Sequence, residues 1–249
     1  MSLKEYNYSK FADIYDRLEV NENVKSFNPI LEKLLKKFNV KKVVDMTCGT
    51  GEQSIYLHKK GYDLSAYDYN KDMIRVAKKK YPKINFKQGD IRKTNYGKFD
   101  AVISIFNSIG HLSKADFERA LKNISNNLKE RGIYIFDIFN LDFMKNNFRT
   151  YEFIDHAQEI DNFKFVRFNK NTLDKNRGIM HINQNTIIQE NLKPIKRIKE
   201  SWDMQIYSSK ELNDILKRNG FEIINFLDME GNKFNKDKSL FILTIARRK

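Results

Sequence analysis

Short apolar runs alternate with amphipathic segments along residues 40–140. The predicted strands run from Val43 to Asp45, from Asp63 to Tyr67, from Ile84 to Lys87, from Phe99 to Phe106 and from Ile133 to Asp137. Helices are expected between them, the first from Gln53 to Lys60. Strands that alternate with helices are typical of a parallel sheet covered by helices on both faces.

The segments on either side of this region extend the α/β pattern. Residues 1–40 are predicted to be mostly helical, and the apolar spacing of residues 29–35 leads into the first strand. Ser208 and Glu211 stand at the positions of a helix capping box, and Asn219-Gly220 is a suitable helix end. Residues 221–226 and 240–246 are predicted to close the sheet as a pair of strands.

Residues 151–207 have a different pattern, in which apolar and polar positions alternate. Residues 163–168, 179–188 and 196–206 are expected to be strands, with a hairpin turn at Asn176-Arg177-Gly178. The sequence therefore predicts a core of residues 1–150 and 208–249, with an antiparallel β insert at 151–207. Two roles for the insert stay open, a lid or substrate element over the site and a dimer interface, because an apolar strand face needs a cover.

The sequence from Val43 to Glu52 carries the main chemical signal. A buried strand ends at Asp45, and the turn Gly49-Thr50-Gly51 then leads into a helix. Glycines let the backbone approach a ligand, and the helix N-terminus favours anionic groups. About 20 residues after Gly49, Asp68 ends the second strand, where a doubly wound fold places a carboxylate for ribose hydroxyls. The pattern predicts a nucleoside-bearing cofactor.

Two further observations narrow the identity of that cofactor. Ser54 stands where the dinucleotide fingerprint requires a third glycine, which makes a dehydrogenase a distant alternative. Asp45, Asp68 and Asp90 end three successive strands, and ligands of open α/β sheets bind at that edge.

Four stretches together resemble the class I S-adenosylmethionine-dependent methyltransferases. They are Asp45–Gly51, Tyr67–Met73, Gly89–Arg92 and Phe99–Val102. The resemblance implies a Rossmann-like, seven-stranded, mostly parallel, doubly wound sheet whose last strand is antiparallel. It also implies S-adenosylmethionine as cofactor and S-adenosylhomocysteine as product. The cofactor-binding residues that it implies are Asp45, Thr47, Gly49, Thr50, Gly51, Asp68, Tyr69, Met73, Asp90, Ile91 and Phe106.

The family's roles can be assigned to several of these positions. The turn from Gly49 to Gly51 is expected to pass under the methionine part, and Asp68 to bind the ribose hydroxyls. Asp90 and Ile91 are expected to hold the adenine, with Asp90 accepting from its exocyclic amine. Phe106 is expected near the cofactor. Asp45 suits a carboxylate that faces a cationic ligand.

The stretch from Phe106 to Leu112 bears on the methyl acceptor. Adenine-N6 methyltransferases of DNA and RNA usually have Asp/Asn-Pro-Pro-aromatic there, and this stretch has no proline. It is instead similar to small-molecule N-methyltransferases, nearest to those that dimethylate nucleotide-linked amino sugars. That resemblance also covers an N-terminal Tyr-Asp, here Tyr15-Asp16, and an insert after strand five, and it makes Tyr15 a candidate active-site residue.

His111 is the best-placed candidate for a catalytic base, because a neutral imidazole near pH 7 accepts a proton from an ammonium group. The alternative is a loop histidine bound to backbone. Asp137 and Asn140 are candidates for substrate contact or for helix capping. In the insert, Arg167 is a candidate for phosphate binding or a solvated strand-edge residue.

Four residues of the insert complete the candidate set. If the insert is a lid, Phe165, Phe168 and Trp202 are expected to roof the site and select the substrate. Arg197 has the same two alternatives as Arg167.

Composition bears on the partners, the metal sites and the location of the protein. The 249 residues carry a formal net charge of +14, but the lysines are scattered, which favours a basic surface over a nucleic-acid site. A positive field also attracts a phosphorylated substrate. No apolar run reaches the roughly 18–20 residues of a membrane span, and no zinc spacing or other metal site is predicted. The single Cys48 fits a reducing compartment, so a cytoplasmic location is expected.

The function predicted from the sequence is methyl transfer to a small molecule, at nitrogen, and the acceptor can be phosphorylated or nucleotide-linked. Two alternatives stay open: an RNA or protein methyltransferase, and a non-catalytic S-adenosylmethionine-binding protein. The sequence leaves the acceptor, the choice between nitrogen and oxygen, the number of methyl groups and the choice between monomer and homodimer undecided.

Overall fold

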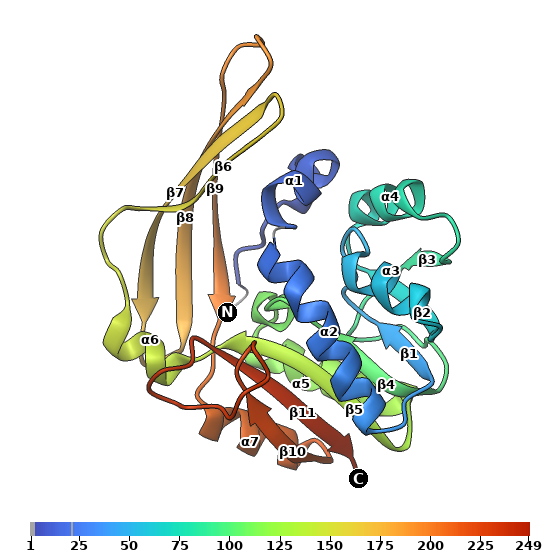
Figure 1. Ribbon diagram of the computed structural model, residues 1–249. Coiled ribbons are helices and arrows are strands. Elements are labelled where there is room, and N and C mark those ends of the chain that lie inside the picture. The colour runs from blue at the N-terminus through green and yellow to red at the C-terminus, as the bar shows by residue number, and fades with distance from the viewer. Residues whose placement is uncertain (1–2, 21) are drawn as a thin grey trace.

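A seven-stranded sheet forms the centre of the computed structural model, which describes residues 3–20 and 22–249. Its strand order is β10-β11-β5-β4-β1-β2-β3 (Figure 1). The strands are β1 (Lys42–Asp45), β2 (Asp63–Asp68), β3 (Phe86–Gln88), β4 (Phe99–Ser104), β5 (Leu128–Phe139), β10 (Phe221–Leu227) and β11 (Phe241–Arg248). β11 is antiparallel to both β5 and β10, and the other pairs are parallel. The predicted fold class is confirmed.

The strand order reverses at β1, which lies between β4 and β2. Crevices at such a reversal are where open α/β sheets bind ligands, at the carboxyl ends of the strands. The turn that follows β1 contains both glycines of the motif. The topology therefore brings this turn, the end of β2 and the end of β4 to one edge of the sheet.

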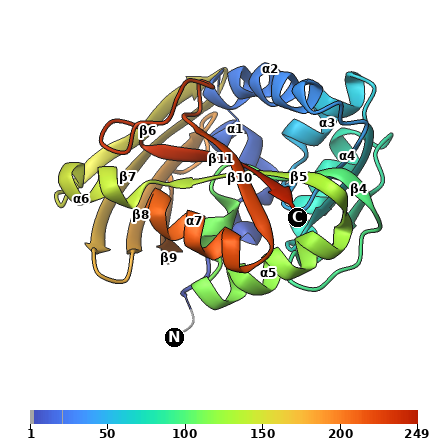
Figure 2. The same ribbon diagram turned by 90° about the horizontal axis from the view of Figure 1, so that it is seen from below.

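Helices cover both faces of the sheet, as Figure 2 shows. Leu31 and Leu35 of α2 (Glu22–Lys37) and Leu57 of α3 (Glu52–Lys59) pack on one face. On the opposite face, α5 (Lys114–Asn127) and α7 (Ser209–Arg218) contribute Phe117 and Leu212 to the largest apolar cluster. α4 (Lys71–Lys80) packs against β2 and β3. Within the described residues, no helix is long and apolar enough to cross a membrane.

A separate four-stranded antiparallel sheet stands beside the core (Figure 1, yellow to orange). Its strands are β6 (Phe153–Ile160), β7 (Phe163–Asp174), β8 (Ile179–Glu190) and β9 (Lys196–Gln205), in that order. α6 (Leu141–Asn147) joins it to β5. The hairpin turn predicted at residues 176–178 lies between β7 and β8, and the capping box predicted at Ser208 and Glu211 is present.

The N-terminal segment lies between this sheet and α4 (Figure 1). It contains the short helices η1 (Tyr8–Lys10), η2 (Ala12–Ile14) and α1 (Tyr15–Glu19). Asp13 and Asp16 pair with Arg75 and Lys80 of α4. On the other side, Lys10, Arg17 and Glu19 pair with Glu200, Glu190 and Arg167 of the insert. The segment thus bridges the two sheets through ion pairs.

Several strand boundaries differ from the sequence prediction, and one strand was missed. The fourth strand ends at Ser104 rather than Phe106, because Phe106 and Asn107 both have left-handed backbone and turn the chain. β5 begins at Leu128 rather than Ile133 and runs on to Phe139. β6 was not predicted, because its side chains are mostly exposed and lack a regular apolar alternation.

Candidate active site

A cleft of about 2310 Å³ lies between the carboxyl edge of the core sheet, the N-terminal segment and the insert. The turn after β1, the end of β2 and the turn after β4 form the wall on the core side. Tyr6, Tyr8 and Tyr15 line it from the N-terminal segment, and Asn169 and Trp202 from the insert. Parts of the chain that are distant in sequence therefore meet in one cavity.

The glycine turn adopts a backbone that a side chain would disturb. Gly49 has φ +54° and Gly51 has φ +90°, both in the left-handed region that favours glycine. A Cβ on Gly51 would lie 2.8 Å from Cζ of Phe86. α3 begins one residue later, so its N-terminus opens at the turn.

Asp45 lies behind the turn rather than in the cleft lining. Its carboxylate accepts hydrogen bonds from the Thr47 amide and the Ser54 hydroxyl, at 3.2 and 2.8 Å, and burial raises its pKa to about 7. The sequence interpretation placed this carboxylate toward a cationic ligand. In the structure its hydrogen bonds are to the motif itself, and they hold the turn in shape.

Asp68 joins two turns at the cleft edge. Its carboxylate accepts the amide protons of Gly49 at 2.8 Å and of Asn70 at 2.8 Å, and burial raises its pKa. Each carboxylate oxygen has a second lone pair beyond the one used in these bonds. The side chain lines the cleft, so the geometry leaves it able to accept further hydrogen bonds from a ligand.

Asp90 is engaged by its neighbour Arg92. The guanidinium donates to both carboxylate oxygens at 2.9 Å. Burial opposes ionisation of Asp90, but the bonds from Arg92 outweigh it, so the pKa of Asp90 lies below its usual value. Arg92 also lies over the ring of Tyr69, which is 60% exposed and faces the cleft. A ligand that bonds to Asp90 must share the carboxylate with Arg92.

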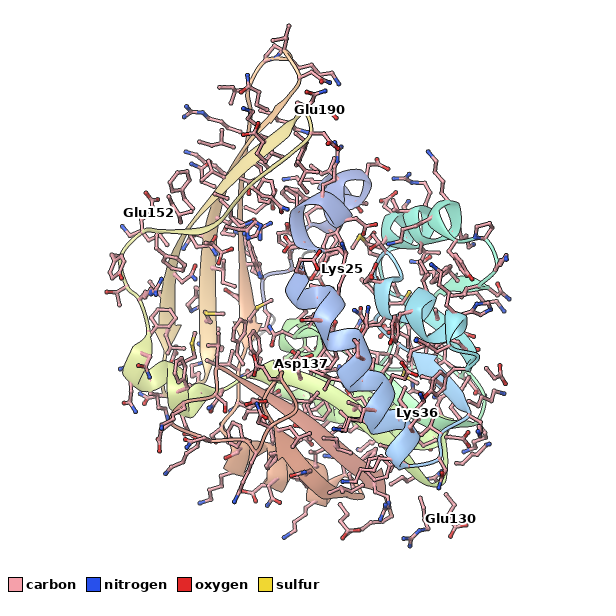
Figure 3. All side chains as sticks on the ribbon, viewed as in Figure 1. Lys25, Lys36, Glu130, Asp137, Glu152 and Glu190 are labelled. Carbon is pink, nitrogen blue, oxygen red and sulfur yellow. The ribbon has the colours of Figure 1, made fainter. Side chains whose placement is uncertain are left out.

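The turn after β4 depends on Asp137, which Figure 3 labels near the base of the insert. Phe106 and Asn107 have φ values of 60° and 56°. Both of their amides donate to the fully buried carboxylate of Asp137, whose pKa burial raises to about 7. This contact holds Phe106 at the cleft, where its ring packs edge-on against Phe27. Asp137 therefore holds the turn after β4 in place at the cleft.

Asn140 caps α6, and helix capping was one of the two roles expected for it. Its side chain accepts from the Asp142 amide and donates to the carbonyls of Lys236 and Ser239. The residue is fully buried and serves the fold.

His111 lies at the end of η3 (Ser108–His111), where its Nε2 atom is 2.7 Å from the hydroxyl of Tyr8. Burial lowers the pKa of His111 to about 4, so the ring is neutral at pH 7. Burial also raises the pKa of Tyr8 well above its usual value, so the phenol keeps its proton. When the neutral ring carries its proton on Nδ1, Tyr8 donates to Nε2, and in the other tautomer Nε2 donates to the Tyr8 oxygen.

The predicted site residues mostly gather in this cleft. Those that line it are Tyr15, Thr47, Gly49, Thr50, Asp68, Tyr69, Met73, Asp90, Ile91, Phe106 and His111. Asp45 and Gly51 shape the turn from behind. The sequence reasoning missed Tyr8 and the polar residues Asn169, Asn171 and Gln184. Their local sequence carries no chemical motif, and only the alternation of β7 and β8 marks the last three as inward-facing.

The charge of the cleft is opposite to that of the whole chain. The chain has 46 basic and 32 acidic residues, but ten acidic and five basic residues of the described chain line the cleft. The acidic ones are Glu5, Glu19, Glu52, Asp68, Asp90, Asp116, Asp137, Asp155, Asp228 and Glu230. The basic ones are Arg92, Arg149, Arg167, Lys233 and Lys238. The lining favours a cationic ligand.

Sequence comparison assigns this arrangement to a family. The family described as "Methyltransferase domain" matches residues 43–132, which contain the glycine turn, Asp68 and Asp90. An uncharacterised protein of Methanocaldococcus jannaschii is 31% identical over 90% of this chain and 78% of its own length. The chain belongs to the class I S-adenosylmethionine-dependent methyltransferases. Its cofactor is S-adenosylmethionine.

Relatives with assigned activities are similar over about half of this methyltransferase. The glycine/sarcosine N-methyltransferase of Parasynechococcus marenigrum is 35% identical over 53% of this chain and 50% of its own. The dTDP-3-amino-3,4,6-trideoxy-α-D-glucopyranose N,N-dimethyltransferase of Streptomyces venezuelae is 24% identical over 56% of this chain and 64% of its own.

Solved structures extend the likeness to the whole chain and show its fold. A S-adenosylmethionine-dependent methyltransferase of Clostridium acetobutylicum has a TM-score of 0.80 at 22% identity, over 97% of this chain and 98% of that one. A sugar N-methyltransferase of Streptoalloteichus has a TM-score of 0.77 at 16% identity, over 100% of this chain and 95% of that one.

The cleft of the methyltransferase fits its cofactor. The Thr47 hydroxyl is buried at the glycine turn without a hydrogen-bond partner among the described residues, and it lines the cleft. Asp68 retains unused lone pairs beside it, and the left-handed glycines leave the backbone accessible. An acidic lining also suits the sulfonium and ammonium groups of S-adenosylmethionine.

Proposed function

We propose that this methyltransferase transfers its methyl group to the nitrogen of a small-molecule amine. The observation that carries the proposal is the acidic cleft in a basic protein. An amine arrives largely as its ammonium ion near pH 7, and acidic groups in a cleft concentrate cations. The same groups repel the phosphates of RNA, for which affinity depends on neutralising cations.

The residues at the core wall are proposed to hold the cofactor. S-adenosylmethionine, when bound, would supply an electrophilic methyl group on a sulfonium, and the leaving group would be the neutral thioether S-adenosylhomocysteine. Thr47 and the backbone from Gly49 to Gly51 bind its methionine part, and Asp68 accepts from the ribose hydroxyls. Ile91 packs on the adenine, and Asp90 accepts from its amine while it shares its oxygens with Arg92.

The acceptor amine is proposed to lose its proton through Tyr8 and His111. In the tautomer with the proton on Nδ1, an ammonium N–H donates to the Tyr8 oxygen as the phenol proton moves to Nε2 of His111. The amine is left neutral, and the imidazolium, whose pKa is about 4, releases the proton to solvent at pH 7. The hydrogen bond of 2.7 Å between Tyr8 and His111 provides the path. Tyr15, whose ring centroid lies 6.1 Å from that of Tyr8, closes the same wall.

The two parts of the chain are proposed to divide the binding of the two ligands. The core, residues 1–150 and 208–249, carries the core wall that holds the cofactor and also Tyr8, Tyr15 and His111 at the acceptor. The insert, residues 151–207, faces the acceptor. The activities for which the relatives are named support a small amine as the acceptor, because glycine, sarcosine and an amino sugar are all small amines.

A methyl-transfer assay on whole-cell metabolites tests the proposal. The protein is incubated with methyl-labelled S-adenosylmethionine and an extract, and label is counted in small-molecule, protein and nucleic-acid fractions. We expect label in the small-molecule fraction, on a nitrogen that mass spectrometry locates. Label in nuclease-sensitive material, lost at raised salt, would overturn the proposal and give the surface charge of +14 a direct role.

A further inference from the structure

The strand register of the insert builds a polar patch in the middle of the face that lines the cleft. Asn169 of β7 lies opposite Gln184 of β8. Two pairs further along, on the same face of the sheet, Asn171 lies opposite Ile182, which itself lies opposite Trp202 of β9. These side chains line the cleft. The patch defined by Asn169, Asn171 and Gln184 is called the amide patch below.

Apolar clusters border the amide patch on both sides. Phe163, Phe165 and Ile188 pack with the N-terminal segment toward the tip of the insert. Met180 and Trp202 pack with α6 toward its base. An apolar continuation of these clusters would bury more surface at no polar cost, so the patch is not explained by the packing of the insert.

The amide patch is buried and under-bonded. Asn169, Asn171 and Gln184 are each between 7% and 8% exposed. The Oδ1 atoms of both asparagines have no hydrogen-bond partner in the described part of the chain, and Nε1 of Trp202 beside them has none. Gln184 accepts from Thr186 Oγ1, at 3.4 Å. Buried polar groups normally have partners, so these amides, which line the cleft, retain hydrogen-bonding capacity for a ligand.

Arg167 lies on the same face as the amide patch but does not make it an anion-binding site. Arg167 is 6% exposed and lines the same face, but its guanidinium pairs with Glu19 and, at 3.5 Å, with Asp155. Two carboxylates therefore balance one cation. A phosphate placed here would meet those two carboxylates without a spare positive charge from Arg167, whereas a neutral group would not be repelled.

We propose that the amide patch binds an uncharged, multiply hydroxylated part of the methyl acceptor. This inference rests on the proposed function and specifies its substrate class as a hydroxylated amine without a phosphate at this position. A side-chain amide offers a donor and an acceptor side by side, and rotation about its terminal bond exchanges them. Neighbouring hydroxyls, which both donate and accept, match such a pair.

Three amine probes of related shape test the proposal by calorimetry on the protein loaded with S-adenosylhomocysteine. Glucosamine carries hydroxyls, cyclohexylamine has none, and glucosamine 6-phosphate adds a phosphate. We expect glucosamine to bind at least about tenfold more tightly than cyclohexylamine, since several hydrogen bonds are gained. The phosphate should tighten binding by less than about twofold, or weaken it.

Variants of the amide patch test whether it causes the preference for glucosamine over cyclohexylamine. In the double variant N169L/N171L, glucosamine and cyclohexylamine should bind within about twofold of each other. Thr172→Val, on the opposite face of the same strand, is the matched control and should keep the full preference. The affinity for S-adenosylhomocysteine shows whether the core wall is intact, and thermal unfolding shows whether the variant is folded. If the double variant does not fold, Asn171→Leu alone takes its place.

The outcomes separate this inference from the proposed function. Equal or absent binding of glucosamine and cyclohexylamine by the unaltered protein overturns the inference, as does tighter binding of the phosphate or a preference that survives in the leucine variant. None of these measurements requires methyl transfer, so the location of the methyl label judges the proposed function independently.

Discussion

The two walls of the cleft are built in different ways. On the core side, Asp45 and Asp68 accept hydrogen bonds from residues no more than 19 positions away, and the turn that they hold is continuous in sequence. On the acceptor side, Tyr8 meets His111 across 103 positions, and the amide patch comes from two strands. The carboxylates of the core wall accept hydrogen bonds from residues near them in sequence, whereas the insert wall leaves two buried amide oxygens unpaired within the described chain.

This difference indicates which ligand each wall serves. A wall made of backbone and short local contacts suits a ligand that is the same in every member of a family. A wall made of separate side chains can change with the acceptor while the turn beside it stays intact, because loops and inserted elements tolerate change better than a core. The predictions below test that separation, from the largest expected effect to the smallest.

Gly51→Ala should abolish measurable cofactor binding. The new Cβ would lie 2.8 Å from Phe86 and would occupy a φ of +90°, so the turn has to move. Gly61→Ala is the matched control: its φ is +87°, but a Cβ there would have open space around it, with no described atom beyond its chain neighbours within 4 Å. It should cost about 1 kcal/mol of stability and keep the affinity for S-adenosylhomocysteine in calorimetry. Equal affinities of the two variants would contradict the role of the turn.

Tyr8→Phe should lower turnover by about 100-fold and leave cofactor affinity unchanged, because it removes the proton path but no part of the core wall. His111→Ala should have a similar effect, and the double variant should lose little more than either single one. The measurement is the initial rate of methyl transfer to the acceptor that the labelling experiment identifies. Tyr151→Phe, at a residue 63% exposed, is the control. Unchanged turnover in Tyr8→Phe would remove the pair from the mechanism.

Asp68→Ala should weaken S-adenosylhomocysteine binding by about 1.5–3 kcal/mol, the contribution of a hydrogen bond to a charged group. Acceptor affinity should change less, since Asp68 belongs to the core wall. Asp63→Ala, at the exposed start of the same strand, should bind the cofactor normally. Calorimetry that gives the same affinity for both variants would show that the ribose lies elsewhere.

Asp137→Asn should change how stability depends on pH. The pKa of Asp137 is about 7 in the folded protein and 3.8 without its surroundings, so the folded state favours the proton. Its contribution is complete below about pH 4 and is lost as the pH rises through 7. The unfolding free energy of the variant should therefore fall less between pH 4 and pH 7, by more than about 1.4 kcal/mol. Asp45 titrates similarly in both proteins and cancels. Parallel curves from urea unfolding would refute this assignment.

Much of the core wall could be predicted because its information is local. The spacing of Asp45, Gly49, Gly51 and Asp68 follows one strand–turn–helix–strand unit, which is continuous in sequence. Even so, the direction of the Asp45 side chain could not be read from the motif. Its partner Ser54 lies in the helix beyond the turn, and packing decided that the carboxylate points inward.

The sequence by itself determined the α/β class, the order of strands and helices, the insert after β5 and the cofactor edge of the sheet, because apolar periodicity and turn residues act over short distances. Only the tertiary structure decided which side chains share the acceptor wall. Tyr8 faces His111, and Glu19 balances Arg167, because ion pairs and apolar contacts fold the N-terminal segment between two sheets. Contacts across such separations depend on how the elements pack, and no local pattern encodes them.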